Sequence, residues 1–145
     1  MIKKTITYTD YNGDKQTRDF YFNLNKVECM ELEYGLGPGT SLTSSIQTII
    51  DNKDMGTIIR TIKNIVLTAY GQKSPDGNRF VKTEESREAF EQSPAFEAIY
   101  WELINDIDKS ADFIAGIMPG EVRDKLGSDP AKALIEETKT MTVIN

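Results

Sequence analysis

Residues 54–80, DMGTIIRTIKNIVLTAYGQKSPDGNRF, decide the fold because they join a long amphipathic helix to a sharply punctuated loop. Asp54 is placed to cap the helix. Apolar residues then recur at three- and four-residue spacing, namely Ile58, Ile59, Ile62, Ile65, Val66, Ala69 and Tyr70. Gly71 stands where a left-handed residue closes a helix, and residues 74–77 (SPDG) have Pro and Gly placed as in a type I turn. We therefore predict a core helix, with partners on more than one side, followed by a basic exit loop.

The amino-terminal segment has two runs of alternating apolar and polar residues, which is typical of half-buried strands. The apolar positions are Ile2, Ile6 and Tyr8 in the first run and Phe20, Phe22 and Leu24 in the second. Between the runs, Asn12-Gly13 suits the positive φ angles of a type I′ turn, so we predict a β-hairpin. A two-stranded hairpin is marginal alone, and we expect its apolar face to rest on helices.

The rest of the chain indicates further helices. Asn25 and Glu28 match a capping box that opens a helix over about residues 26–34, with Val27, Met30 and Tyr34 on one face. A short helix is expected over about residues 42–50, and Thr83 is placed to cap an acidic one.

Ser93-Pro94 is expected to start a second long apolar helix, whose stripe consists of Phe96, Ile99, Tyr100, Leu103, Ile104 and Ile107. We predict that this helix packs against the central one. Ser110 or Asp108 then opens another helix, which Pro119-Gly120 ends.

The predicted fold class is α+β, mostly α, with an amino-terminal β-hairpin packed on a bundle of five to six helices. We expect residues 1–120 to form this domain. Residues 121–145 carry weaker patterns and are expected to form a short helical or partly disordered extension.

Composition narrows the classes of function. The chain has 145 residues, the size of one domain, and a net charge of −6, which opposes nucleic-acid binding. It has no apolar run of membrane-spanning length and no signal-peptide pattern at its start, so we expect a cytoplasmic protein that does not enter membranes. The single cysteine, Cys29, lies among helical apolar positions and is expected to be a small buried hydrophobe.

The charges are unevenly distributed. Residues 51–82 carry six basic and three acidic groups, and residues 83–110 carry two basic and eight acidic groups. Three interpretations are open: the two blocks face each other within the fold, they pair between subunits, or they are solvated helix faces. For pairing between subunits the candidate residues are Arg60, Lys63, Lys73, Arg79, Glu84, Glu88 and Glu91.

The sequence argues against an enzyme. It contains no histidine, the commonest general base and metal ligand, and no G-x-S-x-G nucleophile motif. The glycines of residues 35–39 lack the Lys-Ser or Lys-Thr pair of a phosphate-binding loop. We therefore predict no catalytic residue, no cofactor and no metal site, and a carboxylate-dependent metal enzyme remains the less favoured alternative.

Several segments, taken in order, resemble the tail assembly chaperones of long-tailed (siphovirus-type) phages and prophages of Gram-positive bacteria. They are the hairpin residues 4–13 and 20–24, the segment AYGQKSPDGNRFVK at 69–82, and FIAGIMP at 113–119. The resemblance spans roughly residues 1–120. It implies a small, largely helical, non-enzymatic protein that binds the tape measure protein and helps the tail tube protein to polymerise around it. It also implies a homo-oligomer, a frameshifted longer form of the same reading frame, a location in the host bacterial cytoplasm and absence from the mature virion.

For partner binding, we expect a helix of the tape measure protein to lie against the flank of the second long stripe. The predicted anchors are Tyr100, Trp101, Phe113 and Met118. The competing interpretation is that these four side chains complete the protein's own core. The alternative function is a small virion structural protein, such as a tail completion or connector component.

Overall fold

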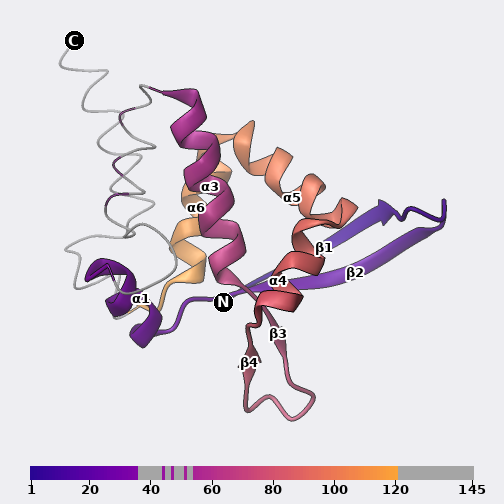
Figure 1. Cartoon of the computed structure of the whole chain (residues 1–145), viewed down its shortest axis with the longest axis horizontal. Coiled ribbons are helices and arrows are strands. Elements are labelled where there is room, and N and C mark those ends of the chain that lie inside the picture. The colour runs from indigo at the N-terminus through magenta and orange to yellow at the C-terminus, as the bar shows by residue number, and fades with distance from the viewer. Residues whose placement is uncertain (36–43, 45–46, 48–50, 52–53, 121–145) are drawn as a thin grey trace.

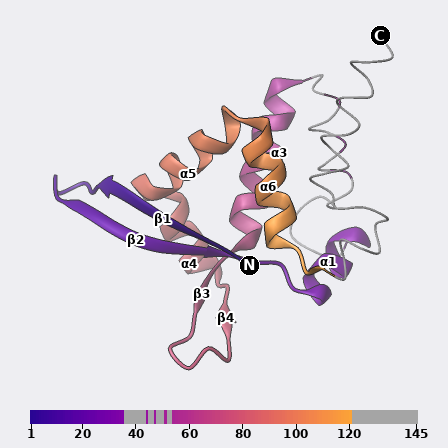
Figure 2. The same ribbon diagram turned by 180° about the vertical axis from the view of Figure 1, so that it is seen from behind.

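The structure, a computed structural model, describes residues 1–35, 44, 47, 51 and 54–120. The elements in chain order are β1 (Ile2–Thr9), β2 (Lys15–Phe22), α1 (Lys26–Glu33), α3 (Met55–Ala69), β3 (Tyr70–Lys73), β4 (Phe80–Val81), α4 (Glu84–Glu91), α5 (Pro94–Ile104) and α6 (Ile107–Ile117). Figures 1 and 2 show this arrangement from two sides. The predicted α+β, mostly α class with an amino-terminal hairpin is confirmed. The predicted helix over 42–50 and the extension 121–145 lie outside the described residues.

The predicted hairpin is confirmed, with an antiparallel register from Ile2 opposite Phe22 to Thr9 opposite Lys15. The predicted type I′ turn on Asn12-Gly13 is wrong by one residue, because the Gly13 N–H donates to the Asp10 carbonyl (3.0 Å) and closes a turn centred on Tyr11 and Asn12. The Asp10 carboxylate favours this turn by accepting from the backbone N–H groups of Asn12 and Asp14. Gly13 takes the left-handed position at the end of the turn, with φ 87°.

The core lies between one face of the hairpin and the helices. Phe22 is fully buried, and its ring meets those of Tyr70, Phe90 and Phe113 at centroid distances of 5.9, 5.8 and 5.2 Å. The Tyr70 and Phe90 rings stack at 4.1 Å. This aromatic cluster connects the sheet to α4 and α6, as expected for a hairpin that is marginal alone.

The central helix, α3, is confirmed, and Asp54 caps it by accepting from the Gly56 N–H. Two positions differ from the prediction. Ile59, assigned to the core face, is 41% exposed, and Thr61, which was not assigned to that face, is buried. The buried residues of α3 are Ile58, Thr61, Ile62, Ile65, Val66 and Ala69. At about 100° per residue, Ile59 falls just outside the margin of this stripe.

The predicted exit loop is a second hairpin. The sheet order is β1-β2-β3-β4, with Tyr21 opposite Gly71 and Lys73 opposite Phe80. The prediction that Gly71 closes the helix in the left-handed conformation is wrong, because the chain is already extended at Tyr70 and Gly71 has no positive φ. Gly71 is needed for close packing instead, since a Cβ there would lie 2.4 Å from Cε2 of Phe80. The turn over residues 74–77 forms, with the Gly77 N–H donating to the Ser74 carbonyl at 2.9 Å.

The predicted caps Asn25, Thr83 and Ser93 are confirmed as the N-caps of α1, α4 and α5. The predicted packing of α5 on α3 is confirmed by their contacts. The long stripe through Ile107 is wrong, because α5 ends at Ile104 and Ile107 begins α6. Asp106, rather than Ser110 or Asp108, caps α6, because its carboxylate accepts from the backbone N–H groups of Asp108 and Lys109.

Candidate partner-binding surface

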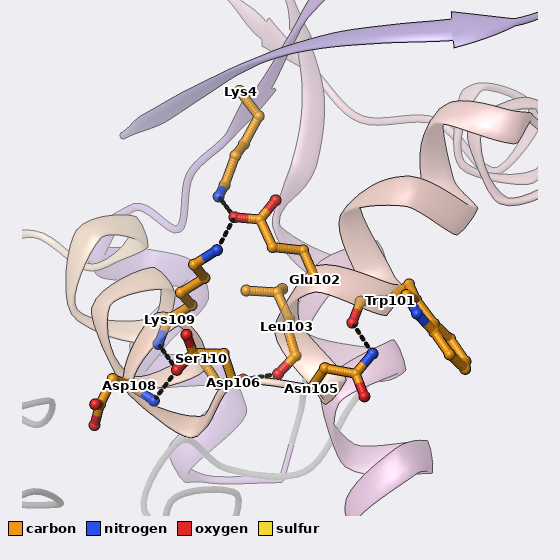
Figure 3. Close-up of polar contacts among 9 residues, drawn as sticks. All are labelled: Lys4, Trp101, Glu102, Leu103, Asn105, Asp106, Asp108, Lys109 and Ser110. Atoms are coloured by element: carbon orange, nitrogen blue, oxygen red, sulfur yellow. Dashed lines mark hydrogen bonds and ion pairs between the residues drawn. The ribbon is translucent and has the colours of Figure 1, made fainter.

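The corner between α5 and α6 fixes the end of α5 that bears Trp101. The Asn105 side-chain amide donates to the Trp101 carbonyl at 2.9 Å, and the buried Ser110 hydroxyl donates to the Leu103 carbonyl at 2.6 Å. Figure 3 shows these bonds beside the Asp106 cap, with the Trp101 ring pointing away from them. The same two carbonyls also accept long backbone bonds, Trp101 from the Asn105 N–H at 3.2 Å and Leu103 from the Asp106 N–H at 3.4 Å. The two side chains therefore reinforce the backbone bonds at the end of α5.

A charged group ties the same corner to the sheet. The Glu102 carboxylate accepts from Lys4 of β1 at 3.1 Å and lies 3.6 Å from the Lys109 ammonium of α6, as Figure 3 shows. A carboxylate between two cations joins three elements at one point. The end of α5 is therefore joined to both β1 and α6.

Tyr100 joins α5 to α3. Its hydroxyl donates to the Ile59 carbonyl at 2.9 Å, and its ring stacks on Phe96 at a centroid distance of 5.5 Å. Burial raises the pKa of the Tyr100 hydroxyl because the charged form loses solvation. Tyr100 therefore stays a neutral donor, and its bond to the Ile59 carbonyl joins the backbone of α3 to α5.

Both helices joined by this bond carry exposed apolar side chains. Trp101 is 66% exposed, Met55 is 60% exposed and Ile59 is 41% exposed. Met55 lies one helical turn before Ile59, and Trp101 follows Tyr100. We call these four residues, Met55, Ile59, Tyr100 and Trp101, the α3–α5 surface. Exposed aromatic and methionine side chains of this kind are enriched where proteins bind each other.

The structure separates the four residues predicted as anchors. Tyr100 and Trp101 lie at the α3–α5 surface, whereas Phe113 and Met118 are 3% and 2% exposed and complete the protein's own core. Sequence analysis missed Met55 and Ile59. For Ile59 the three- and four-residue spacing carried no signal of exposure, because Ile59 fits the same periodic pattern as the buried positions.

Helix α1 carries a second exposed apolar stripe. Val27, Met30 and Tyr34 are 58%, 57% and 77% exposed. They occupy one side of the helix, and the buried Cys29 and Leu32 occupy the other. The predicted face is therefore present, but it is turned to the outside.

One ion pair attaches α1 to the second hairpin. The Lys82 ammonium donates to the Glu28 carboxylate at 2.6 Å and to the Asn23 carbonyl at 2.7 Å. Burial lowers the pKa of Lys82, and the Glu28 carboxylate opposes this shift. Beside them, burial raises the pKa of the Cys29 thiol to about 11, which keeps it protonated at neutral pH, and its burial is as predicted.

The charged residues predicted for self-association are divided. Lys63 and Glu91 form an ion pair within one chain at 2.9 Å, so the basic and acidic blocks meet partly inside the fold. The others are exposed and, within the described part of the chain, form no ion pair; they are Arg60, Lys73, Arg79, Glu84 and Glu88.

Among the residues that the structure describes, no group of three His, Cys, Asp or Glu side chains is placed to hold a metal ion. Within the same ranges, no helix has the length and apolar character needed to cross a membrane.

Comparison with known proteins gives one result. The family model described as phage tail assembly chaperone matches residues 1–143. It covers both the hairpin-and-helix region and most of the segment after residue 120. No curated protein and no solved structure significantly matches the chain.

Proposed function

The chain belongs to the phage tail assembly chaperone family, and from this premise we propose that it binds the tape measure protein of a long-tailed phage or prophage of Gram-positive bacteria. In this proposal it keeps a helical segment of that protein soluble and promotes assembly of the tail tube protein around it. The role requires no chemical turnover. The chain acts in the host cytoplasm and is absent from the finished virion.

The observation that carries the proposal is the α3–α5 surface. Trp101 is the large aromatic side chain of this surface that is mostly exposed, and tryptophan is enriched among residues that dominate binding energy. The backbone beneath it is held by the Asn105 and Ser110 bonds. A rigid support lowers the entropy lost on binding, which favours a preformed contact.

The partner chemistry follows from the shape of this surface. Helices α3 and α5 pack against each other, and each presents exposed apolar side chains. An amphipathic partner helix can lay its apolar side along such a flank, with contacts every three or four residues. Met55 suits a partner of irregular surface because a methionine side chain is flexible.

Co-expression with the tape measure protein encoded by the same phage tests the proposal. We expect the tape measure protein to become soluble and to copurify with this chain. Trp101→Ala should weaken the binding free energy of the complex by about 2 kcal/mol or more, which is typical of an anchor residue at an interface. The reason is that the variant lacks the indole ring that contacts the partner. Binding is measured by titrating the purified chain into the purified tape measure protein. Circular dichroism checks that the variant keeps its helical content.

Tyr11→Ala is the matched control, since Tyr11 is 86% exposed but lies in the first hairpin turn. It should leave binding unchanged. If the tape measure protein is equally insoluble with and without this chain, and no complex survives purification, the chaperone proposal fails. Detection of the chain in purified virions would then favour the alternative, a small virion structural protein.

A frameshifted longer form belongs to the same proposal. A slippery nucleotide run near the 3′ end of the gene, followed by an overlapping open frame, is the expected signature. A gene without either feature would remove this part of the proposal and leave the binding role intact.

A further inference from the structure

The edge of β2 is only partly paired. β3 pairs with β2 at Tyr21 and Phe22 alone, and the rest of β2, from Lys15 to Phe20, has no strand beside it on that edge among the described residues. Figure 1 shows the reason, because the β3–β4 hairpin turns away from the direction of β1 and β2. An open strand edge carries free backbone donors and acceptors.

The register shows which residues point their backbone groups to this edge. In an antiparallel pair, alternate residues bond to one neighbour and the others point outward. The Asp10 N–H donates to the Asp14 carbonyl, and the Asn23 N–H donates to the Ala69 carbonyl on the β3 side. Counting by twos from these bonds, Lys15, Thr17 and Asp19 direct their N–H and C=O groups to the open edge.

A cleft lies in the angle between β2 and the second hairpin. It has a volume of about 570 Å³ and is lined by residues 18–21 on one wall and residues 70–77 on the other. The part of the open edge from Arg18 to Phe20 therefore faces a space that can hold residues of an extended chain, and the part from Lys15 to Thr17 continues the same edge beyond the cleft.

The cleft carries cations that lack carboxylate partners. Arg18 lies 5.7 Å from the centroid of the Phe20 ring, and Lys73 lies 4.8 Å from that of Tyr21. Neither forms an ion pair within the part of the chain that the structure describes. The two acids of the cleft are held by other hydrogen bonds, because Asp19 accepts from Thr5 and Asp76 accepts from Ser74 and Asn78.

We propose that this cleft binds an extended, acidic segment of a partner protein, which adds as a further strand to the open edge of β2. The backbone of the segment bonds to Lys15, Thr17 and Asp19. Its acidic side chains pair with Arg18 on the face of the sheet that bears Phe20, and with Lys73 on the opposite face, which bears Tyr21. A peptide fits better than a small anion because the edge offers both donors and acceptors at strand spacing, whereas an anion uses donors alone. This inference concerns a surface separate from Trp101 and does not depend on the tape measure protein.

Four seven-residue peptides, capped at both ends, test it on the ¹⁵N-labelled full chain. One repeats Thr-Glu-Glu, which places Glu on both faces of a strand, and one repeats Thr-Lys-Lys; we call them the Thr-Glu and Thr-Lys peptides. The third is the Thr-Glu peptide N-methylated at every residue, and the fourth is the Thr-Glu sequence with Pro at its centre. We expect the Thr-Glu peptide to shift the amide signals of Lys15, Thr17 and Asp19 saturably and to bind at least tenfold more tightly than the Thr-Lys peptide. The N-methylated and Pro-containing peptides should lose at least tenfold in affinity, since they keep the charge and lose the backbone donors.

Variants of the chain give the matching control. Thr17→Pro removes the outward N–H at the open edge, and Thr7→Pro makes the same change directly opposite on β1. Thr17→Pro should lose binding and Thr7→Pro should keep it, and R18A/K73A should remove the preference for Glu over Lys. The inference is overturned if millimolar Thr-Glu peptide shifts none of these amides, or if the N-methylated peptide binds equally well. The peptide arms use the unaltered chain, so they decide the matter even if a proline variant fails to fold.

Discussion

Leu103 and Ile62 are the residues through which α5 and α3 meet the core. They are 1% and 6% exposed, and both line a small internal space with Ser110 and Phe113. The Ser110 hydroxyl bonds to the carbonyl of Leu103 itself. Leu103 therefore contributes both a buried side chain to the core and a carbonyl that accepts a hydrogen bond at the end of α5.

Truncation of these side chains should be costly. Ile62→Ala and Leu103→Ala are each expected to lower the free energy of unfolding by about 2 to 5 kcal/mol, because a buried aliphatic group is lost and a cavity remains. Chemical denaturation measures the change. Ile59→Ala is the control from the exposed side of α3 and should cost under about 0.5 kcal/mol. Equal small values for all three would show that the core is assigned wrongly.

The buried Cys29 thiol should make the free energy of unfolding fall as pH rises above 9. Burial raises the thiol pKa from the ordinary 9.0 to about 11 in the fold, so the folded state holds the proton more tightly. The stabilisation is present below pH 9 and is lost as pH rises towards 11. Denaturation of the unaltered chain and of Cys29→Ala should therefore show a difference that shrinks over this range. A difference that stays constant with pH would contradict the assignment.

The elements divide into those that a local pattern specifies and those that it does not. The caps Asn25, Thr83 and Ser93 were predictable because a cap needs only its own side chain and the next three residues. The β3–β4 hairpin was not, since its strands are short and Gly71 resembles a helix stop. Its pairing depends on β2, far away in the sequence, and on the Phe80 ring that covers Gly71. Asp106 was missed because Asp108 and Ser110 compete with it as caps within the same few residues.

The same limit applies to the candidate site. The exposure of Trp101 was predictable because its position falls beside the apolar stripe of its helix. The partition of the other anchors was not, since Phe113 and Trp101 are both aromatic residues on amphipathic helices and only tertiary packing separates them.

Lys82 should determine how firmly α1 is attached. Lys82→Met is expected to cost about 1 to 3 kcal/mol, because it leaves the partly buried Glu28 carboxylate without its charged donor. Hydrogen exchange of the α1 amides should accelerate with it. Lys63→Met is the control, since the Lys63–Glu91 pair is more exposed and is worth about 1 kcal/mol or less. If both substitutions have the same small effect, the ion pair is not what attaches α1.

The whole molecule places its helices against one face of the first hairpin and leaves the other face polar. Ile2, Ile6, Phe20 and Phe22 belong to the packed face, while Thr5, Thr7, Thr9 and Thr17 are exposed on the other. The α3–α5 surface, the α1 stripe and the cleft beside β2 lie on different elements. The three surfaces are therefore separate regions of the molecule.

Self-association is the prediction that belongs to this scale. We propose that Arg60, Lys73 or Arg79 of one copy meets Glu84 or Glu88 of another. Association should weaken with added salt, because exposed charges are screened over about 8 Å at physiological ionic strength. Sedimentation velocity at low and high salt measures it. Reversing both glutamates to lysine should lower association, and reversing Arg60 and Arg79 to glutamate in the same chain should restore it. A chain that is strictly monomeric at low salt and high concentration would contradict the proposal.

The contact between the first hairpin and α6 also has a consequence for synthesis. The Leu24 N–H donates to the Ile117 carbonyl at 2.8 Å, and a Cβ on Gly116 would lie 2.5 Å from Cδ1 of Ile2. The strands leave the ribosome first, yet the helix that closes over them is the last element of the described chain. At about 5 to 20 residues per second, the nascent hairpin waits several seconds or more for that helix. During translation the Phe22 side chain, whose ring meets Phe113 of α6, therefore stays partly uncovered until α6 emerges.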